Sequence, residues 1–347
     1  MELSIVDLAP MPEDGTATEA FEHTVERARQ AERLGYSRFW VAEHHDFTDS
    51  VASTTPEVLI PHVAAKTEDI RVGSGTVLLN HYSPYKVAET FGVLDALEPD
   101  RIDLGLGRAT GNPASDLALQ PDRSQRRRTG DDQAEKIDEV VKHLYGGFEG
   151  DHPFRDLEVP RAGDSAPEIW VHGSSPASAK IAGELGLPYS FAAFIRPEPA
   201  VQAFETYRKH FDPAAHGASP EEPRGAIAVN LTCAETDEEA ARLRAVAEAS
   251  SRLLRNGRVD RLPIRSVDRA IDVLGGVPEP MSSTDIAPGE WPRHLSGSPS
   301  TAREILEELT SQAGVDEVVI QSQHADPETT LRSHELLADA VGLESRE

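Results

Sequence analysis

Short runs rich in β-branched and aromatic residues alternate with amphipathic helical segments along the whole of this 347-residue chain. The strand-like runs cover residues 3–9, 38–45, 70–79, 101–107, 168–173, 189–194, 225–234 and 317–323. Strands that alternate with helices pair in parallel through right-handed crossovers. Eight such units favour an α/β fold of the (β/α)8 TIM barrel type and leave an open eight-stranded sheet as the alternative.

The first helical segment, residues 18–35, illustrates the pattern. Thr18 is the expected N-cap and Gly35 the expected residue just past the C-terminal end. Apolar residues between them keep a spacing of three or four, as one buried helix face requires, at Phe21, Val25, Ala28, Ala31 and Leu34.

Residues 256–300 interrupt the alternation between the seventh and eighth strand-like runs. This stretch is rich in Pro, Gly and Ser and has no sustained helical stripe. Long excursions of this kind in a compact domain are usually functional lids or mobile segments. We therefore expect one barrel domain over residues 1–347, with an extended irregular lid or substrate segment at 256–300.

The chain is strongly acidic, with 60 Asp and Glu against 34 Lys and Arg and a formal net charge of −26. This balance argues against binding to nucleic acid or to an anionic membrane face, which both require a basic surface. Dispersed carboxylates suit a protein that stays hydrated in concentrated salt, so a halophilic origin is one hypothesis. An ordinary acidic enzyme is the other.

A single cysteine, Cys233, lies in an apolar run, and one cysteine cannot form an intrachain disulfide. The N-terminal residues lack the basic and apolar regions of a signal peptide. No apolar run approaches the length of a membrane span. These features predict a cytoplasmic protein.

Active sites of (β/α)8 barrels form at the C-terminal ends of the strands, and Glu43, His44 and His45 lie at one such end. Successive strand residues point to opposite faces, so His44 and His45 cannot both bind one metal ion from a straight strand. We expect no metal site. A neutral imidazole here suits proton transfer or hydrogen bonding to an anion, and two structural histidines are the alternative.

A second strand end predicts a phosphate site. Gly173, Ser174 and Ser175 precede a helix, with Ser178 one turn further on, and a helix N-terminus offers free N–H groups and a positive dipole. Arg108 ends the neighbouring strand and would complete the site. A plain N-cap and a structural salt bridge are the alternative readings. Neither a Rossmann GxGxxG nor a P-loop GxxxxGK[ST] motif occurs.

The same segments resemble the bacterial-luciferase-like, flavin-dependent monooxygenases. The resemblance runs over residues 1 to about 340 and rests on the motifs FWVAEHH, RVGSGTVLL, SPYKVAETFGVLDAL, RIDLGLGRATG, WVHGSSPASAKIAGELG and GSPSTAREILEELTSQAG. It implies an enzyme that binds reduced FMN, often supplied by a separate flavin reductase, and reacts it with O2. The resulting flavin hydroperoxide would oxidise a small organic substrate.

The resemblance also implies roles for individual residues. The phosphate would lie against Arg108, Ser175, Ser178 and the backbone of Ser174 and Thr110, and the isoalloxazine near Ala9, Gly75 and Thr76. A non-proline cis peptide is expected at Gly75–Thr76. His44 would protonate or stabilise the oxygenated flavin, with Glu43 in an orienting role and His45 in a supporting one.

Two departures from the family pattern stand out. His172 occupies a position that is commonly apolar in relatives, so it would add a polar contact to the cofactor, and Gly107 replaces a cysteine of some luciferases. An F420-dependent hydride-transfer enzyme on the same barrel is the main alternative function, and a non-catalytic flavin-binding protein is a weaker one. We also expect a homodimer formed through outer helices.

Overall fold

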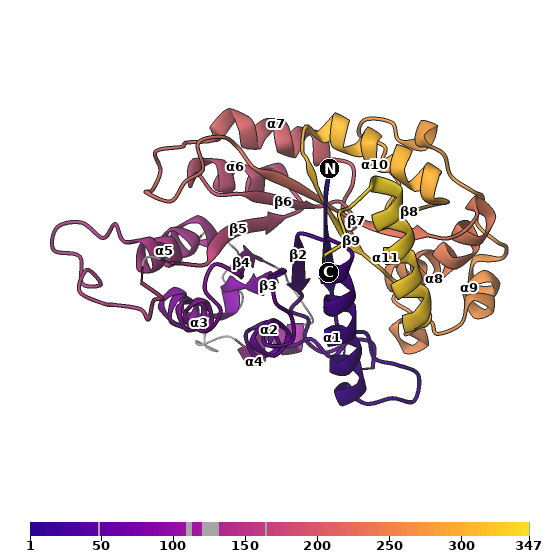
Figure 1. The fold of residues 1–347 in the computed structure, drawn as a ribbon, viewed down its shortest axis with the longest axis horizontal. Helices are drawn as coiled ribbons and strands as arrows, with labels where there is room; N and C mark the ends of the chain where they lie inside the picture. Colours follow the sequence, from indigo (N-terminus) through magenta and orange to yellow (C-terminus); the bar gives the residue numbers. More distant parts are fainter. Residues whose placement is uncertain (48, 109–112, 120–131, 164, 347) are drawn as a thin grey trace.

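The computed structural model describes residues 1–47, 49–108, 113–119, 132–163 and 165–346. Its strands are listed here in chain order: β1 (Glu2–Asp7), β2 (Arg38–Val41), β3 (Arg71–Leu78), β4 (Ile102–Gly107), β5 (Glu168–Gly173), β6 (Tyr189–Ala192), β7 (Gly225–Cys233), β8 (His294–Gly297) and β9 (Glu317–Gln321). Strands β1 to β7 pair in succession and in parallel, and β9 pairs with both β7 and β1 (Figure 1). The ring is closed, which confirms the (β/α)8 TIM barrel and excludes the open sheet.

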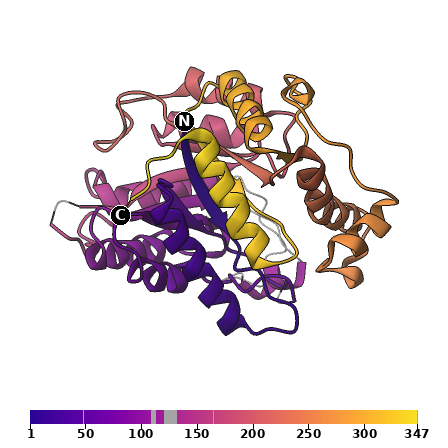
Figure 2. The same cartoon turned by 45° about the vertical axis from the view of Figure 1, so that its right-hand side comes forward.

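Helices surround the barrel: α1 (Ala17–Arg33), α2 (Pro56–Ala64), α3 (Pro84–Leu97), α4 (Pro113–Leu119), α5 (Gln133–Tyr145), α6 (Pro176–Glu184), α7 (Ala200–His210), α8 (Asp237–Arg255), α9 (Val267–Leu274), α10 (Pro299–Ala313) and α11 (Pro327–Val341). The last helix packs beside the first, so the outer layer closes as the sheet does (Figure 2). Within the described ranges, no helix is long and apolar enough to span a membrane.

The first helix begins two residues earlier than predicted. Thr16, not Thr18, is the N-cap, and its side chain and that of Glu19 cap each other's backbone N–H groups. The sequence Thr-x-x-Glu is a capping box, a stronger start signal than a threonine alone. Gly35 follows the helix with a φ of +84°, as predicted.

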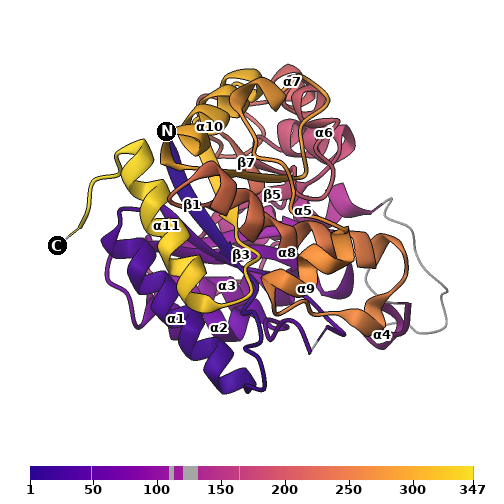
Figure 3. The same ribbon diagram turned by 90° about the vertical axis from the view of Figure 1, so that its right-hand side faces the viewer.

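The excursion is more ordered than the sequence predicts. It contains α9, whose eight residues form a helix packed beside α8 (Figure 3), and β8, which extends the sheet at the outer end of β7. The prediction of an entirely irregular segment with no helical stripe was therefore wrong. Ser266 caps α9 and Gly275 ends it, so the short helix is delimited by local signals that the surrounding Pro and Gly residues obscured.

Two apolar cores hold the barrel. The larger lies between strands and helices, and a smaller one fills the barrel interior around Val6, Trp40, Trp170 and Val319. The two indole rings meet edge to face, with centroids 5.9 Å apart. Burial of such large rings inside the ring of strands makes the barrel a packed core with access only at its ends.

An ionic network closes the N-terminal end of the barrel. Arg38 lies 3.0 Å from Asp103, 2.9 Å from Glu168 and 3.0 Å from Glu317, and all four side chains come from the first residues of their strands or the residue next to them. Buried charges are tolerated when they are paired and hydrogen-bonded.

Candidate active site

The C-terminal ends of β3 and β4 form a glycine floor, defined here as Gly75, Thr76 and Gly107. The register of the two strands shifts between Ser74 and Val77, and the Gly75–Thr76 peptide bond is cis, as predicted. A Cβ on Gly75 would lie 2.8 Å from Cβ of Trp40, and one on Gly107 would lie 2.7 Å from Cγ2 of Thr76. No larger side chain fits at either position without displacement, so the floor keeps a bare backbone surface.

Ala9 follows the end of β1, is fully buried and has a φ of 48°, a left-handed conformation that is uncommon outside glycine. Its backbone N–H donates to Oδ1 of Asp7 at 2.7 Å. Although burial opposes ionisation, the Arg27 guanidinium and the hydrogen bonds from Arg27, Ala9 and Thr24 lower the pKa of Asp7. A buried ion pair therefore holds the backbone turn that places Ala9.

Glu43 is buried behind the mouth and gathers three donors. Its Oε1 accepts from the Tyr82 hydroxyl at 2.7 Å and lies 2.7 Å from Nε2 of His45, and its Oε2 accepts from the Leu78 backbone N–H at 2.8 Å. Burial first, and the nearby Glu43 charge second, raise the pKa of Tyr82, so the phenol remains a donor. The carboxylate thus orients His45; His44 is not among its partners in the described part of the chain.

His44 lies in the loop after β2, which ends at Val41, and unlike the buried Glu43 it is exposed. Its ring is exposed to solvent and meets the exposed Phe47 ring edge to face at 6.4 Å. Its backbone N–H donates to the Ser53 carbonyl at 2.9 Å. Surrounding protein atoms lower the pKa of His44, and repulsion from His45 adds to the effect. The imidazole is therefore neutral near pH 7 and can accept or donate a proton.

A second polar layer lies behind His45, and sequence reasoning missed most of it. His81 lies 3.1 Å from Asn80 and 3.6 Å from Asp116, with its ring 6.3 Å from that of His45. His81 and Tyr82 come shortly after the end of β3, so the rule that active sites form at strand ends could have found them. Across the residues that the structure describes, no three His, Cys, Asp or Glu side chains converge as a metal site.

The predicted phosphate region lies at β4, β5 and α6. Ser175 is the N-cap of α6 and accepts from the Ser178 N–H at 3.3 Å, while the Ser178 hydroxyl donates to the Ser175 carbonyl at 2.8 Å and lies 3.0 Å from the Tyr189 hydroxyl. Ser174 lies half-buried in the turn before the cap. Through these bonds the hydroxyls of Ser175 and Ser178 stabilise the start of α6.

Arg108 lies next to this turn. Leu106 pairs with Val171, so the register carries Arg108 alongside Gly173 at the strand ends. Its side chain is exposed and makes no ion pair with any residue that the structure describes, which leaves the guanidinium available for an anion. Thr110, also predicted to contact the phosphate, lies outside the described residues.

His172 points into the barrel, away from the start of α6. Its ring meets that of Trp40 edge to face at 4.9 Å, and a Cβ on Gly105 would lie 2.8 Å from its Nε2. That nitrogen is buried and finds no hydrogen-bond partner among the described residues. Burial lowers the pKa of His172 to about 3. The structure therefore places a neutral imidazole nitrogen inside the barrel, beside Gly105 and Trp40.

A polar chain occupies the far side of the mouth. Nδ2 of Asn230 on β7 lies 3.5 Å from the Gln321 side-chain oxygen, and its Oδ1 lies 3.2 Å from Nδ1 of His294 on β8. Nε2 of His294 lies 2.8 Å from the Ser251 hydroxyl, and burial, with nearby arginines, lowers the pKa of His294 to about 4. The excursion therefore contributes a polar group beside the barrel interior.

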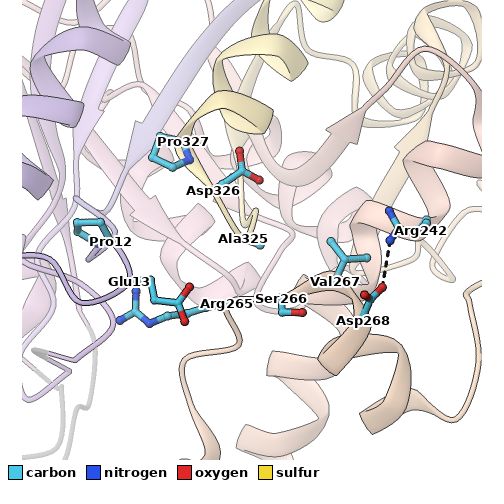
Figure 4. A pocket seen from close by; sticks show the side chains of 10 residues that line it. All are labelled: Pro12, Glu13, Arg242, Arg265, Ser266, Val267, Asp268, Ala325, Asp326 and Pro327. Carbon is cyan, nitrogen blue, oxygen red and sulfur yellow. Dashed lines mark hydrogen bonds and ion pairs between the residues drawn. The ribbon is translucent and has the colours of Figure 1, made fainter.

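A cavity of about 470 Å³ lies beside the mouth, between the loops after β1 and β9 and the α8–α9 pair (Figure 4). Pro12, Glu13, Arg265, Asp268 and Asp326 are among its lining residues, and an ion pair of 3.1 Å joins Asp268 to Arg242. None of the predicted site residues lines it.

Comparisons with known proteins agree with this geometry. The family described as luciferase-like monooxygenase matches residues 1–317. The chain is 35% identical over 341 residues to the luciferase-like monooxygenase of Escherichia coli K12, covering 97% of this chain and 96% of that protein. It is 36% identical over 349 residues to N-acetyl-S-alkylcysteine monooxygenase of Bacillus subtilis, covering 98% of each.

Solved structures give the same result. The crystal structure of apo-MsnO8 superposes with a TM-score of 0.85 at 39% identity, with 99% of both chains covered. Two more distant structures share the fold alone. They are the oxygenating constituent of 3,6-diketocamphane monooxygenase in complex with FMN, with a TM-score of 0.68 at 23% identity, and an F420-dependent tetrahydromethanopterin reductase, with a TM-score of 0.67 at 16% identity. The chain belongs to the luciferase-like monooxygenase family.

Proposed function

We propose that this protein is a monooxygenase that uses reduced FMN and O2 to oxidise a small organic substrate. The observation that carries the proposal is the combination of an exposed His44 at the mouth with a bare glycine floor at the ends of β3 and β4. A planar ring can lie against such a floor, and a neutral imidazole beside it is suited to proton transfer during oxygen chemistry. The complex of one distant neighbour with FMN is compatible with this cofactor.

Reduced flavin, when bound, supplies the electrons that activate oxygen. The residues of this chain would then hold and protect it. Arg108 and the start of α6 are suited to the phosphate, since a guanidinium beside a helix N-terminus favours a phosphomonoester. Ala9, Gly75 and Thr76 would border the ring, and His172 would meet a polar edge from below.

His44 would exchange a proton with the reacting oxygen, because its ring faces the open mouth and is neutral near pH 7. Glu43 and Tyr82 hold His45 next to it and keep the loop in place. The exposed Phe47 ring against His44 offers an apolar contact to a substrate. We propose that the reduced flavin comes from a separate reductase, as the family resemblance implies.

An anaerobic titration of the purified protein with reduced FMN and with reduced F420, followed by tryptophan fluorescence, tests the cofactor. We expect micromolar binding of FMN, about −8 kcal/mol. Oxygen uptake in the presence of candidate aldehydes, sulfonates and amines then tests the reaction. Binding of F420 alone would instead indicate hydride transfer, and binding of FMN without oxygen uptake would indicate a flavin-binding protein.

A homodimer through α2 and α3 is proposed on a separate observation. Val58 on α2 and Val93 and Leu97 on α3 are exposed by 67%, 43% and 63%, although they are large apolar side chains on packed neighbouring helices. Exposed apolar groups on adjacent elements are typical of association surfaces. Sedimentation of the protein and of Leu97→Glu tests this: a dimer that becomes a monomer supports the interface, and an unchanged mass contradicts it.

The acidic surface motivates the proposal of salt tolerance. With a net charge of −26, self-repulsion should weaken as added salt screens it. A melting temperature that rises between dilute buffer and molar KCl would support a halophilic source, and one that stays constant would contradict it.

A further inference from the structure

Arg265 connects the excursion to the backbone of two loops at the barrel mouth. It lies just before α9, and its guanidinium donates to the Met11 carbonyl at 2.5 Å and to the Asp49 carbonyl at 2.7 Å. Met11 belongs to the loop after β1 and Asp49 to the loop after β2. Figure 4 shows the side chain extending along the cavity toward Glu13, in the first of these loops. A planar guanidinium can bridge two acceptors in fixed geometry, which a single ammonium cannot.

The two loops that Arg265 joins are already paired with each other. Pro10 and Val51 form an antiparallel bridge, the Met11 N–H donates to the Ser50 carbonyl at 2.9 Å, and the Ala52 N–H donates to the Ala9 carbonyl at 2.8 Å. These bonds connect the left-handed turn at Ala9 with the loop after β2.

The same pairing continues to His44. The Ser53 N–H donates to the Leu8 carbonyl at 3.4 Å, and the His44 N–H donates to the Ser53 carbonyl at 2.9 Å. A short, continuous set of hydrogen bonds therefore leads from the guanidinium of Arg265 to the backbone of both Ala9 and His44.

The other end of Arg265 is firmly held. Ile264, the preceding residue, is buried in an apolar cluster with Ala245, Ala249 and Leu253 of α8. Arg242 of α8 also lies 3.1 Å from Asp268 of α9, but both side chains are exposed, so this ion pair adds little to the packing. The α8–α9 pair is thus one packed unit, and Arg265 connects this unit to the two loops at the mouth.

We propose that Arg265 is a positioning residue, which clamps the loops after β1 and β2 so that Ala9 and His44 keep their places at the mouth. The role of those two residues in catalysis rests on the proposed function; the clamp itself does not. The excursion between β7 and β9 then acts on the reaction centre from outside the site, through two backbone carbonyls and without touching the flavin position.

The test compares Arg265→Met, Arg265→Lys and a matched control, Arg242→Met, which removes a neighbouring guanidinium from the same cavity. Hydrogen exchange of the Met11, His44 and Ala52 amides is measured on the protein without cofactor. We expect exchange to be about tenfold faster in Arg265→Met, intermediate in Arg265→Lys and unchanged in Arg242→Met. Without the Arg265 guanidinium, the two loops can separate without breaking its hydrogen bonds to the Met11 and Asp49 carbonyls, so the amides open more often. Unchanged exchange in both Arg265 variants would overturn the proposal, whatever the protein catalyses.

A second measurement links the clamp to chemistry. For the variants that bind reduced FMN, we follow its reoxidation by O2 and its affinity in parallel. The expected result for Arg265→Met is reoxidation altered by about tenfold with affinity changed less than threefold, because geometry at His44 changes while the phosphate region at β4 and β5 does not. Equal losses of affinity in Arg265→Met and Arg242→Met would contradict the clamp. Failure of the wild-type protein to bind FMN would contradict the proposed function and leave the exchange result to decide the clamp.

Discussion

Nε2 of His45 lies 2.7 Å from Oε1 of Glu43, so the buried carboxylate orients the second histidine of the pair and leaves His44 free at the mouth. The side chains of Glu43, His44 and His45 therefore do not all face the same way. The buried Glu43 side chain contacts both Tyr82 and His45, whereas His44 is exposed to solvent.

Glu43→Gln should destabilise the loop after β2 by more than the loss of one negative charge alone would. Three donors converge on the two carboxylate oxygens, and an amide presents an N–H₂ group to at least one of them. We expect a loss of about 1–3 kcal/mol in the free energy of unfolding, because a buried donor loses its acceptor. Urea unfolding measures it. Glu26→Gln, at an exposed position on α1, is the control and should change stability little.

His44→Ala should keep flavin binding and lose oxygenation. The ring is exposed and anchors no described element through its side chain, so the fold and the glycine floor should survive. Proton transfer by a positioned side chain contributes about 10²–10⁴-fold to rate. We expect substrate oxidation to fall within that range while the Kd for reduced FMN stays within about threefold. A variant with weakened flavin binding and normal turnover would refute the assignment.

Arg108→Met should remove the preference for FMN over riboflavin, which lacks the phosphate. Hydrogen bonds to charged groups contribute about 1.5–3 kcal/mol, so FMN should bind about 10–100-fold more weakly. Riboflavin binding should be unchanged. Arg303→Met, on the exposed face of α10, removes an equal charge far from the mouth and serves as the control. Equal weakening of both ligands by Arg108→Met would place the phosphate elsewhere.

Gly107→Ala tests the glycine floor. The new Cβ would lie 2.7 Å from Cγ2 of Thr76 and 3.1 Å from the His172 carbonyl. We expect a loss of about 1–3 kcal/mol in stability from overpacking, together with weaker flavin binding. Gly276→Ala is the matched control, since no atom lies within 4 Å of its Cβ. Unimpaired flavin binding by a folded Gly107→Ala would argue against the floor as the ring site.

Buried neutral histidines predict acid sensitivity. Burial lowers the pKa of His172 to about 3 and that of His294 and His324 to about 4, from an ordinary value of 6.5. The unfolded chain binds protons first as pH falls, so stability is full above pH 6.5 and is lost below it. The slope is about 1.4 kcal/mol per pH unit for each proton.

His172→Gln isolates one of these protons. The difference in unfolding free energy between the wild-type protein and the variant should shrink as the pH is lowered from 7 to 5, since the variant lacks one titrating group. Urea unfolding at both pH values measures it. A constant difference would mean that His172 is protonated or solvated in the folded protein.

Much of the fold could be predicted from the sequence because the necessary signals are local. Eight alternations of strand and helix imply a parallel sheet, and the positions of Glu43, His44 and Arg108 at strand ends imply the mouth of a barrel. The cis peptide at Gly75–Thr76 and the reduced-flavin proposal came from the family resemblance. Thr16 was not predicted as the N-cap of the first helix, although its Thr-x-x-Glu capping box can be recognised in the sequence. The helix and strand within residues 256–300 were not predicted, because frequent Pro and Gly residues obscure them.

Only the tertiary structure decided which side chains meet. Three contacts join residues from different strands and loops. They are the hydrogen bond of Glu43 with Tyr82, the packing of His172 against Trp40, and the contact of Arg265 with Met11 and Asp49. Such contacts depend on strand register, on closure of the barrel and on the path of each loop, and none of these is encoded in a local run of residues. The sequence therefore determined the barrel and the end at which the proposed site lies, while long-range packing decided the partners of each residue there.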